Sequence, residues 1–170
     1  MKYSYGIQSF LFGEITPGTG ALGAATEMKE AVYRDTFNST EAEGTTTDHY
    51  SEMDSTPKVS FTEVGKETIT WQCMETDIDQ LVRLLGGVKT TVDLVDSWSK
   101  PSGAVDLEKY IKVITMDGTI LEYPRVKITS RRNFQLRRNG LWLLDVTMTV
   151  LSPMLPVATP KPAVIISKAQ

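Results

Sequence analysis

The sequence predicts a mainly β protein, an antiparallel β-barrel or two-sheet sandwich with one flanking α-helix. Apolar and polar residues alternate over most of the chain, which is the two-residue period of half-buried strands. The pairs Asp117-Gly118 and Asn139-Gly140 separate such runs and are typical of tight hairpin turns. Only one segment has the spacing of an amphipathic helix, so the sheets are predicted to be antiparallel with a single helix against them.

The first half of the chain contains three strand-like runs, of which the second and third alternate. YGIQSFLF predicts a strand near the N-terminus. KVSFTEV and KETITWQCM follow later, and Gly65 between them predicts a hairpin turn. On the last run Ile69, Trp71 and Cys73 share one face, which we expect to be buried.

The second half repeats the pattern. A strand at 109–116 is predicted to lead through Asp117-Gly118 into TILEY, and residues 125–131 alternate again. Asn139-Gly140 then precedes the clearest strand of the chain, LWLLDVTMTV. Its apolar face consists of Trp142, Leu144, Val146, Met148 and Val150.

The single helix is predicted at about 76–86. Its apolar stripe, at helical spacing, consists of Ile78, Leu81, Val82 and Leu85. Thr76, with Asp79 three residues later, predicts the N-terminal cap, and Gly86-Gly87 predicts the stop. We expect this helix to cover the open side of the sheet or barrel.

One domain is predicted at 1–152, with long polar or glycine-rich loops at 16–25 and 44–57. A turn-rich break follows at 97–104. Residues 153–170 are a Pro-rich C-terminal extension, whose four prolines predict an extended arm and not a packed element. No apolar stretch approaches the roughly 20 residues of a membrane helix, so no membrane-spanning segment is expected.

Glycines in the order G-x-G-x-x-G, Gly18, Gly20 and Gly23, raise the possibility of a dinucleotide site. Such a site needs a helix and then a buried parallel strand after the glycines. The segment that follows, RDTFNSTEAEGTTTDHY, is too polar for that strand. We therefore interpret the motif as a loop and expect no cofactor.

No catalytic or metal-binding residues are predicted. The chain has one His and one Cys, whereas a zinc site usually needs three or four His, Cys or carboxylate ligands. His49 beside Asp48 has the form of a base with its orienting acid, but a lone histidine in a polar, Thr-rich stretch is more simply solvated. Cys73 is expected to pack inside with a raised pKa, and not to act as a nucleophile.

Charge is unevenly distributed, although the net charge is only −3. Residues 27–54 hold eight acids and two Lys or Arg, whereas 124–140 hold six Lys or Arg and no acid. Segments of opposite sign pair within a fold or between copies, or else form two solvated faces. The arginines around Phe134 would also suit phosphates or stacked bases. The predicted subunit-interface residues are Glu41, Glu43, Asp48, Glu52, Trp98, Arg131, Arg132, Arg137 and Arg138.

The order of elements resembles a known family. A short strand and a glycine loop (GTGALG) precede the acidic segment TEAEGTTTDHYSE, the helix containing LVRLLGG and the hairpin run containing YPRVKIT. Over residues 3–153 this order resembles the major tail tube proteins of tailed bacteriophages. Those proteins are related to the tube proteins of type VI secretion and contractile-injection systems.

The resemblance implies a non-enzymatic subunit that assembles into hexameric rings, stacked as a tube that conducts DNA from capsid to host. The acidic composition, with a pI near 5.2, agrees with a wall to which phosphates do not bind. Expected partners are further copies, the tape measure, terminator and baseplate or tip proteins, and DNA in transit. The expected location is the virion and, during assembly, the bacterial host cytoplasm. The loops at 16–25 and 44–57 would bridge rings.

Three alternatives stay open. A tube protein of an injection or secretion system, or a tail terminator, would share the fold. A monomeric β-barrel with an internal ligand belongs to a different class and would have short loops. An enzyme is the third class, and an activity abolished by His49→Ala would indicate it.

Overall fold

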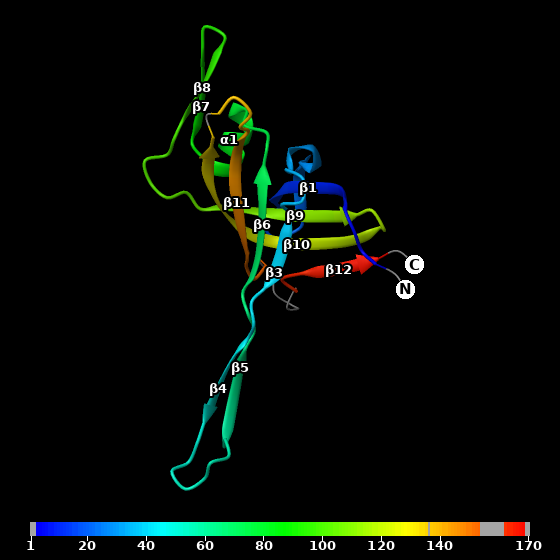
Figure 1. The fold of residues 1–170 in the computed structure, drawn as a ribbon, viewed down its shortest axis with the longest axis vertical. Helices are drawn as coiled ribbons and strands as arrows, with labels where there is room; N and C mark the ends of the chain where they lie inside the picture. Colours follow the sequence, from blue (N-terminus) through cyan, green and yellow to red (C-terminus); the bar gives the residue numbers. More distant parts are fainter. Residues whose placement is uncertain (1–2, 136, 154–161, 169–170) are drawn as a thin grey trace.

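The computed structural model describes residues 3–135, 137–153 and 162–168 and is mainly β, with one α-helix and antiparallel sheets (Figure 1). Eight strands form one sheet in the order β2-β1-β9-β10-β11-β6-β3, with β12 paired to β10. Their bounds are β1 Ile7–Ile15, β2 Leu22–Glu27, β3 Asn38–Glu41, β6 Glu67–Cys73, β9 Leu107–Thr115, β10 Thr119–Phe134, β11 Trp142–Val150 and β12 Ile165–Lys168. The predicted fold class is confirmed as a sandwich, because the strand path stays open and closes no barrel.

Strand β10 organises the sheet, because it runs for 16 residues and pairs along both edges. Its first part pairs with β12 and its second part with β11, while β9 follows the opposite edge. The register to β9 shifts between Tyr123 and Val126, where Pro124 has no N–H to donate to a ladder. In Figure 1, β1, β9 and the start of β10 run across the direction of β6 and β11. The sheet thereby folds over on itself into two layers.

Aromatic side chains fill the space between the layers. The rings of Phe10 and Trp71 meet edge to face with centroids 5.3 Å apart, and Phe37 meets Phe10 at 5.5 Å. The predicted inner face of β6, with Ile69, Trp71 and Cys73, is confirmed as buried. The predicted face of β11 is buried at Leu144, Val146 and Met148, whereas Trp142 at the end of the strand is 44 % exposed.

Helix α1, Ile78–Leu85, packs against β10 and is the predicted helix, shortened at its start. The predicted cap at Thr76 is wrong: Asp77 occupies the N-cap position, without a side-chain hydrogen bond. The predicted stop is confirmed, because Gly86 adopts a left-handed φ of 71°. Leu81 and Leu84 are the buried apolar residues. This helix, the only α-helix of the described residues, has eight residues and cannot cross a membrane.

The predicted hairpin turn at Gly65 is wrong. Strand β5, Val59–Glu63, pairs with β4, Thr45–His49, and β6 pairs with β3, so the four strands form one long two-stranded ribbon. A Cβ on Gly65 would lie only 1.6 Å from the carbonyl oxygen of Ala42. The glycine therefore permits a close approach of two strands and makes no turn. The expected loop at 44–57 accordingly contains β4.

Three further loop predictions need correction. The expected loop at 16–25 is shorter, because β2 begins at Leu22. The break predicted at 97–104 begins inside β8, Val95–Ser99, which forms a hairpin with β7, Val88–Val92. Asn139-Gly140 is not a two-residue turn but the end of a longer connection, closed by a hydrogen bond from the Gly140 N–H to the Arg137 carbonyl.

The C-terminal extension contains a strand that pairs with the sheet, which the sequence did not predict; three of its four residues stay exposed. Residues Ile165–Lys168 form β12, which pairs with Thr119 to Glu122 of β10. This edge of β10 is available because β11 pairs only from Val126 onward. Residues 154–161 and 169–170 of the predicted extension lie outside the described residues.

Candidate functional site: an acidic arm and a basic cleft

Two hairpins project from the sandwich in opposite directions along its longest axis (Figure 1). One is the ribbon of β4 and β5, defined here with its connections as residues 42–66 and called the acidic arm. The other is the β7–β8 hairpin. Every residue of β4 and β5 is exposed, so the sandwich core does not hold either strand. The prediction of a half-buried strand at β5 is therefore wrong, although its alternation is real.

The acidic arm carries five carboxylates and two lysines. Asp54 pairs with Lys58 at 2.6 Å, which keeps the pKa of that carboxyl low, and Asp48 accepts a hydrogen bond from Ser60 at 2.5 Å. Four carboxylates have no cationic partner among the described residues: Glu43, Asp48, Glu52 and Glu63. At the base of the arm Glu41 lies opposite Glu67 in the ladder, which places two like charges side by side. The arm thus carries more negative charge than its own two lysines neutralise.

The acidic arm also exposes apolar side chains. Phe61 and Val59 lie on one face of the ribbon, opposite Thr47 and His49, because cross-strand partners share a face. The rings of Phe61 and His49 meet edge to face at 5.8 Å. Near the tip of the arm, Met53 is 97 % exposed. Apolar groups on a thin ribbon cannot be shielded within the monomer, so they indicate a surface that another molecule covers.

The β7–β8 hairpin turns through two residues in the left-handed conformation, Asp93 with φ 50° and Leu94 with φ 66°. A leucine rarely adopts this conformation, and here its side chain is 99 % exposed. At its base the indole N–H of Trp98 donates to the Gly86 carbonyl at 2.8 Å, which ties the hairpin to the end of α1. A Cβ on Gly87 would lie 2.4 Å from the Ser99 carbonyl oxygen. The hairpin is therefore fixed in direction where it leaves the sandwich.

A basic cleft of about 580 Å³ lies between α1, β8, the connection to β9 and the second part of β10. Its cationic lining residues are Lys100, Lys127, Arg131 and Arg132. Two of these are compensated: Lys127 pairs with Asp106 at 2.5 Å and Arg131 with Asp145 at 3.1 Å.

The other two cations of the basic cleft are not compensated. Arg132 and Lys100 contact no carboxylate among the described residues. The Arg132 guanidinium lies over the Trp98 ring at 5.5 Å and the Phe134 ring at 5.9 Å. In the same cleft the Ser130 hydroxyl is buried without a hydrogen-bond partner. The cleft therefore offers the N–H donors of Arg132 and Lys100, which an anion could accept hydrogen bonds from.

The structure brings the predicted interface residues into two groups. Arg131, Arg132 and Trp98 meet at the basic cleft, and Arg137 and Arg138 lie exposed in the neighbouring β10–β11 connection. Glu43, Asp48 and Glu52 lie on the acidic arm, and Glu41 precedes it. Sequence reasoning missed Lys100, Lys127, Ser130 and the β7–β8 hairpin. The run VKTTV before Asp93 is rich in β-branched residues, but it does not alternate apolar and polar residues, and no glycine or asparagine marks its turn.

The structure also locates the residues that were considered for cofactor binding, catalysis and metal binding. Gly18 and Gly20 lie with left-handed φ in the β1–β2 connection, as predicted for a loop, whereas Gly23 lies within β2; the G-x-G-x-x-G motif thus belongs to an antiparallel hairpin. His49 is exposed on the acidic arm. Burial raises the pKa of the Cys73 thiol to about 11, as expected for a packing residue. Among the described residues no three His, Cys, Asp or Glu side chains are grouped to hold a metal.

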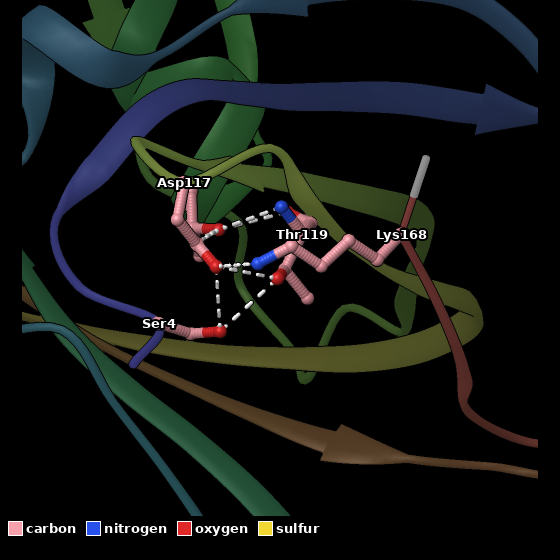
Figure 2. A network of polar contacts seen from close by, with 5 residues as sticks. Ser4, Asp117, Thr119 and Lys168 are labelled. Atoms are coloured by element: carbon pink, nitrogen blue, oxygen red, sulfur yellow. Dashed lines mark hydrogen bonds and ion pairs between the residues drawn. The ribbon is translucent and has the colours of Figure 1, made fainter. Parts of the chain in front are cut away.

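A separate polar cluster at Asp117 fastens both ends of the described chain (Figure 2). Its carboxylate, in the β9–β10 turn, accepts hydrogen bonds from Ser4 at 3.0 Å and Thr119 at 2.9 Å, and from Thr115. It also pairs with Lys168 of β12. The pKa of Asp117 lies well below its usual range, chiefly because of the Lys168 ammonium and then because of the hydroxyl groups that donate to the carboxylate. We call this group the Asp117 clasp; its carboxylate is engaged in structure and is not a free base.

No protein-family model matches the chain, and comparison with curated proteins finds no match. The resemblance to phage tail tube proteins therefore stays a prediction.

Proposed function

We propose that the protein is a structural subunit that assembles with its own copies into stacked rings, forming the tail tube of a tailed bacteriophage. The observation that carries the proposal is the pair of hairpins that project from opposite ends with exposed apolar side chains. A monomer gains nothing from such hairpins, whereas in an assembly each would be buried against a neighbour. Hexameric symmetry comes from the family resemblance alone.

Open sheet edges support the same proposal. Among the described strands, β2 pairs only with β1 and β3 only with β6, so each leaves one row of backbone groups unpaired. Free edges of this kind favour pairing with another chain. A ring of subunits with a heterologous, closing contact would satisfy every such edge by symmetry.

The role in DNA passage follows from the charge and from the resemblance. A net charge of −3 repels phosphate, so DNA in a tube of these subunits would pass without binding. An internal ligand site has less support, because Phe10, Trp71 and Met148 fill the space between the layers. A tail terminator and an injection or secretion tube would use the same surfaces.

Negative-stain electron microscopy of the purified protein over a series of concentrations tests the proposal. We expect rings with a central hole, and stacks of rings at higher concentration. Single rings that never stack would favour a terminator. A monomer at every concentration, checked by sedimentation velocity, would contradict self-assembly and favour a ligand-binding sandwich.

A further inference from the structure

We infer that the basic cleft receives the acidic arm of a second copy, so that subunits join head to tail through these two surfaces. The inference rests on the proposed function and deepens it, because it names the contact by which one copy recognises the next.

The basic cleft has free capacity for carboxylates. The Arg132 guanidinium lies over the rings of Trp98 and Phe134, and no carboxylate among the described residues accepts a hydrogen bond from it. A carboxylate can accept two parallel N–H donors of a guanidinium. Lys100 adds a second cation without a partner among the described residues.

The acidic arm has the matching surplus. Glu52 lies in the connection at its tip, exposed and without a cation among the residues described. Glu43 and Glu63, nearer the base, are equally unpaired. Each surface also has exposed apolar groups in its neighbourhood: Met53 near the tip of the arm, and Leu94 and Val95 at the turn of the β7–β8 hairpin, whose base lines the cleft through Trp98. Opposite charge surrounded by exposed apolar groups is the composition of a specific protein–protein contact.

The strand register shows that an arm cannot reach the cleft of its own chain. Arg132 is level with Leu144, which is level with Cys73 at the C-terminal end of β6. The acidic arm leaves the sheet at the other end of β6, where Glu41 faces Glu67. Six residues of strand separate these levels, about 20 Å. The arm then points further away (Figure 1), so its partner has to be another copy.

A nucleic acid or free phosphate fits the basic cleft less well. Asp106 and Asp145 already lie beside two of its cations, and the protein as a whole is acidic. Long polyanions would be repelled by the rest of the surface, whereas an acidic arm from a second copy brings only a few carboxylates. The contact is heterologous, so it can repeat from copy to copy along an axis.

Charge exchange between the two surfaces tests the inference. Arg132→Glu and Glu52→Arg are each expected to raise the concentration needed for assembly by roughly tenfold or more, because like charges then meet. The double variant, with both changes in one chain, should restore assembly toward the wild-type concentration. Arg34→Glu and Glu30→Arg are the matched controls, because both lie exposed and outside the two surfaces. They change net charge equally and should leave assembly unaltered.

Sedimentation velocity and electron microscopy of all variants distinguish the possible results, with circular dichroism to confirm folding. If the wild type never assembles, the proposed function itself fails. If the wild type assembles and Arg132→Glu or Glu52→Arg assembles equally well, or the double variant gives no rescue, the inference is overturned while the proposed function stands. Inorganic phosphate binding that Arg132→Glu abolishes without affecting assembly would also overturn it, and would identify a phosphate site.

Discussion

Replacement of Gly65 by alanine tests how the acidic arm is held to the sandwich. The added Cβ would lie 1.6 Å from the Ala42 carbonyl oxygen, far inside any observed Cβ contact. The two strands therefore have to separate at the base of the arm. This separation first breaks the hydrogen bond from the Ala42 N–H to the Lys66 carbonyl, which measures 3.0 Å.

The free-energy cost of this separation follows from the hydrogen bonds that are lost. One backbone hydrogen bond contributes about 1 kcal/mol net, and loss of a neighbouring one brings the cost to about 2 kcal/mol. Opening of the arm should then be roughly thirty times more frequent, or about five times if only the Ala42–Lys66 bond is lost. Hydrogen–deuterium exchange is expected to accelerate by this factor in β4 and β5. Protection in β6 should not change, because Ile69, Trp71 and Cys73 stay packed in the core.

Gly103→Ala provides the control. A Cβ at Gly103 meets nothing within 4 Å and its φ is not left-handed, so no change in exchange is expected anywhere. The reasoning would be refuted by unchanged exchange in β4 and β5 of the Gly65 variant. It would be refuted equally by loss of protection that spreads into β6 and β11, since the arm would then be part of the core's cooperative unit.

Two further predictions concern the core and the Asp117 clasp. The folded pKa of Asp117 lies below its unfolded value of about 3.9, so the clasp stabilises the protein above about pH 4 and this stabilisation is lost as the pH falls further. Asp117→Asn should therefore lower the urea midpoint at neutral pH, flatten the decline of that midpoint in acid and accelerate amide exchange in β12. An unchanged midpoint would show that the clasp adds no stability. The Cys73 thiol, buried and with its pKa raised to about 11, should not react with a thiol reagent at mildly alkaline pH until guanidinium unfolds the protein; rapid reaction of the native protein would contradict its burial.

The elements that the sequence predicted correctly have one buried face. In β6 and β11 the alternation places Trp71 and Met148 inside and polar residues outside, so the period of two follows directly from burial. The β9–β10 hairpin was also predicted, because Gly118 at φ 81° supplies the conformation that its turn requires.

The elements that it mispredicted have two exposed faces. In β4, β5, β7 and β8 no core selects the side chains: β5 alternates without a buried face, and β4, β7 and β8 do not alternate at all, so no strand was predicted there. A glycine is equally ambiguous: Gly65 permits two strands to approach, where a turn was expected. Strand β12 follows a Pro-rich segment, and no local signal shows that the free edge of β10 receives it.

The charged segments of the candidate site were visible in the sequence, but their separation depends on pairing between distant strands. Clusters at 27–54 and 124–140 could as well have met within one subunit. For the acids from Glu41 onward, the ladders β10–β11, β11–β6 and β6–β3 prevent this. They place Arg132 level with Cys73 and Glu41 level with Glu67, at opposite ends of β6. The basic cleft therefore lies at one end of β6 and the acidic arm at the opposite end. With its own arm out of reach, the cleft can be neutralised by an arm only if a second copy supplies it, and that requirement recurs at each added subunit.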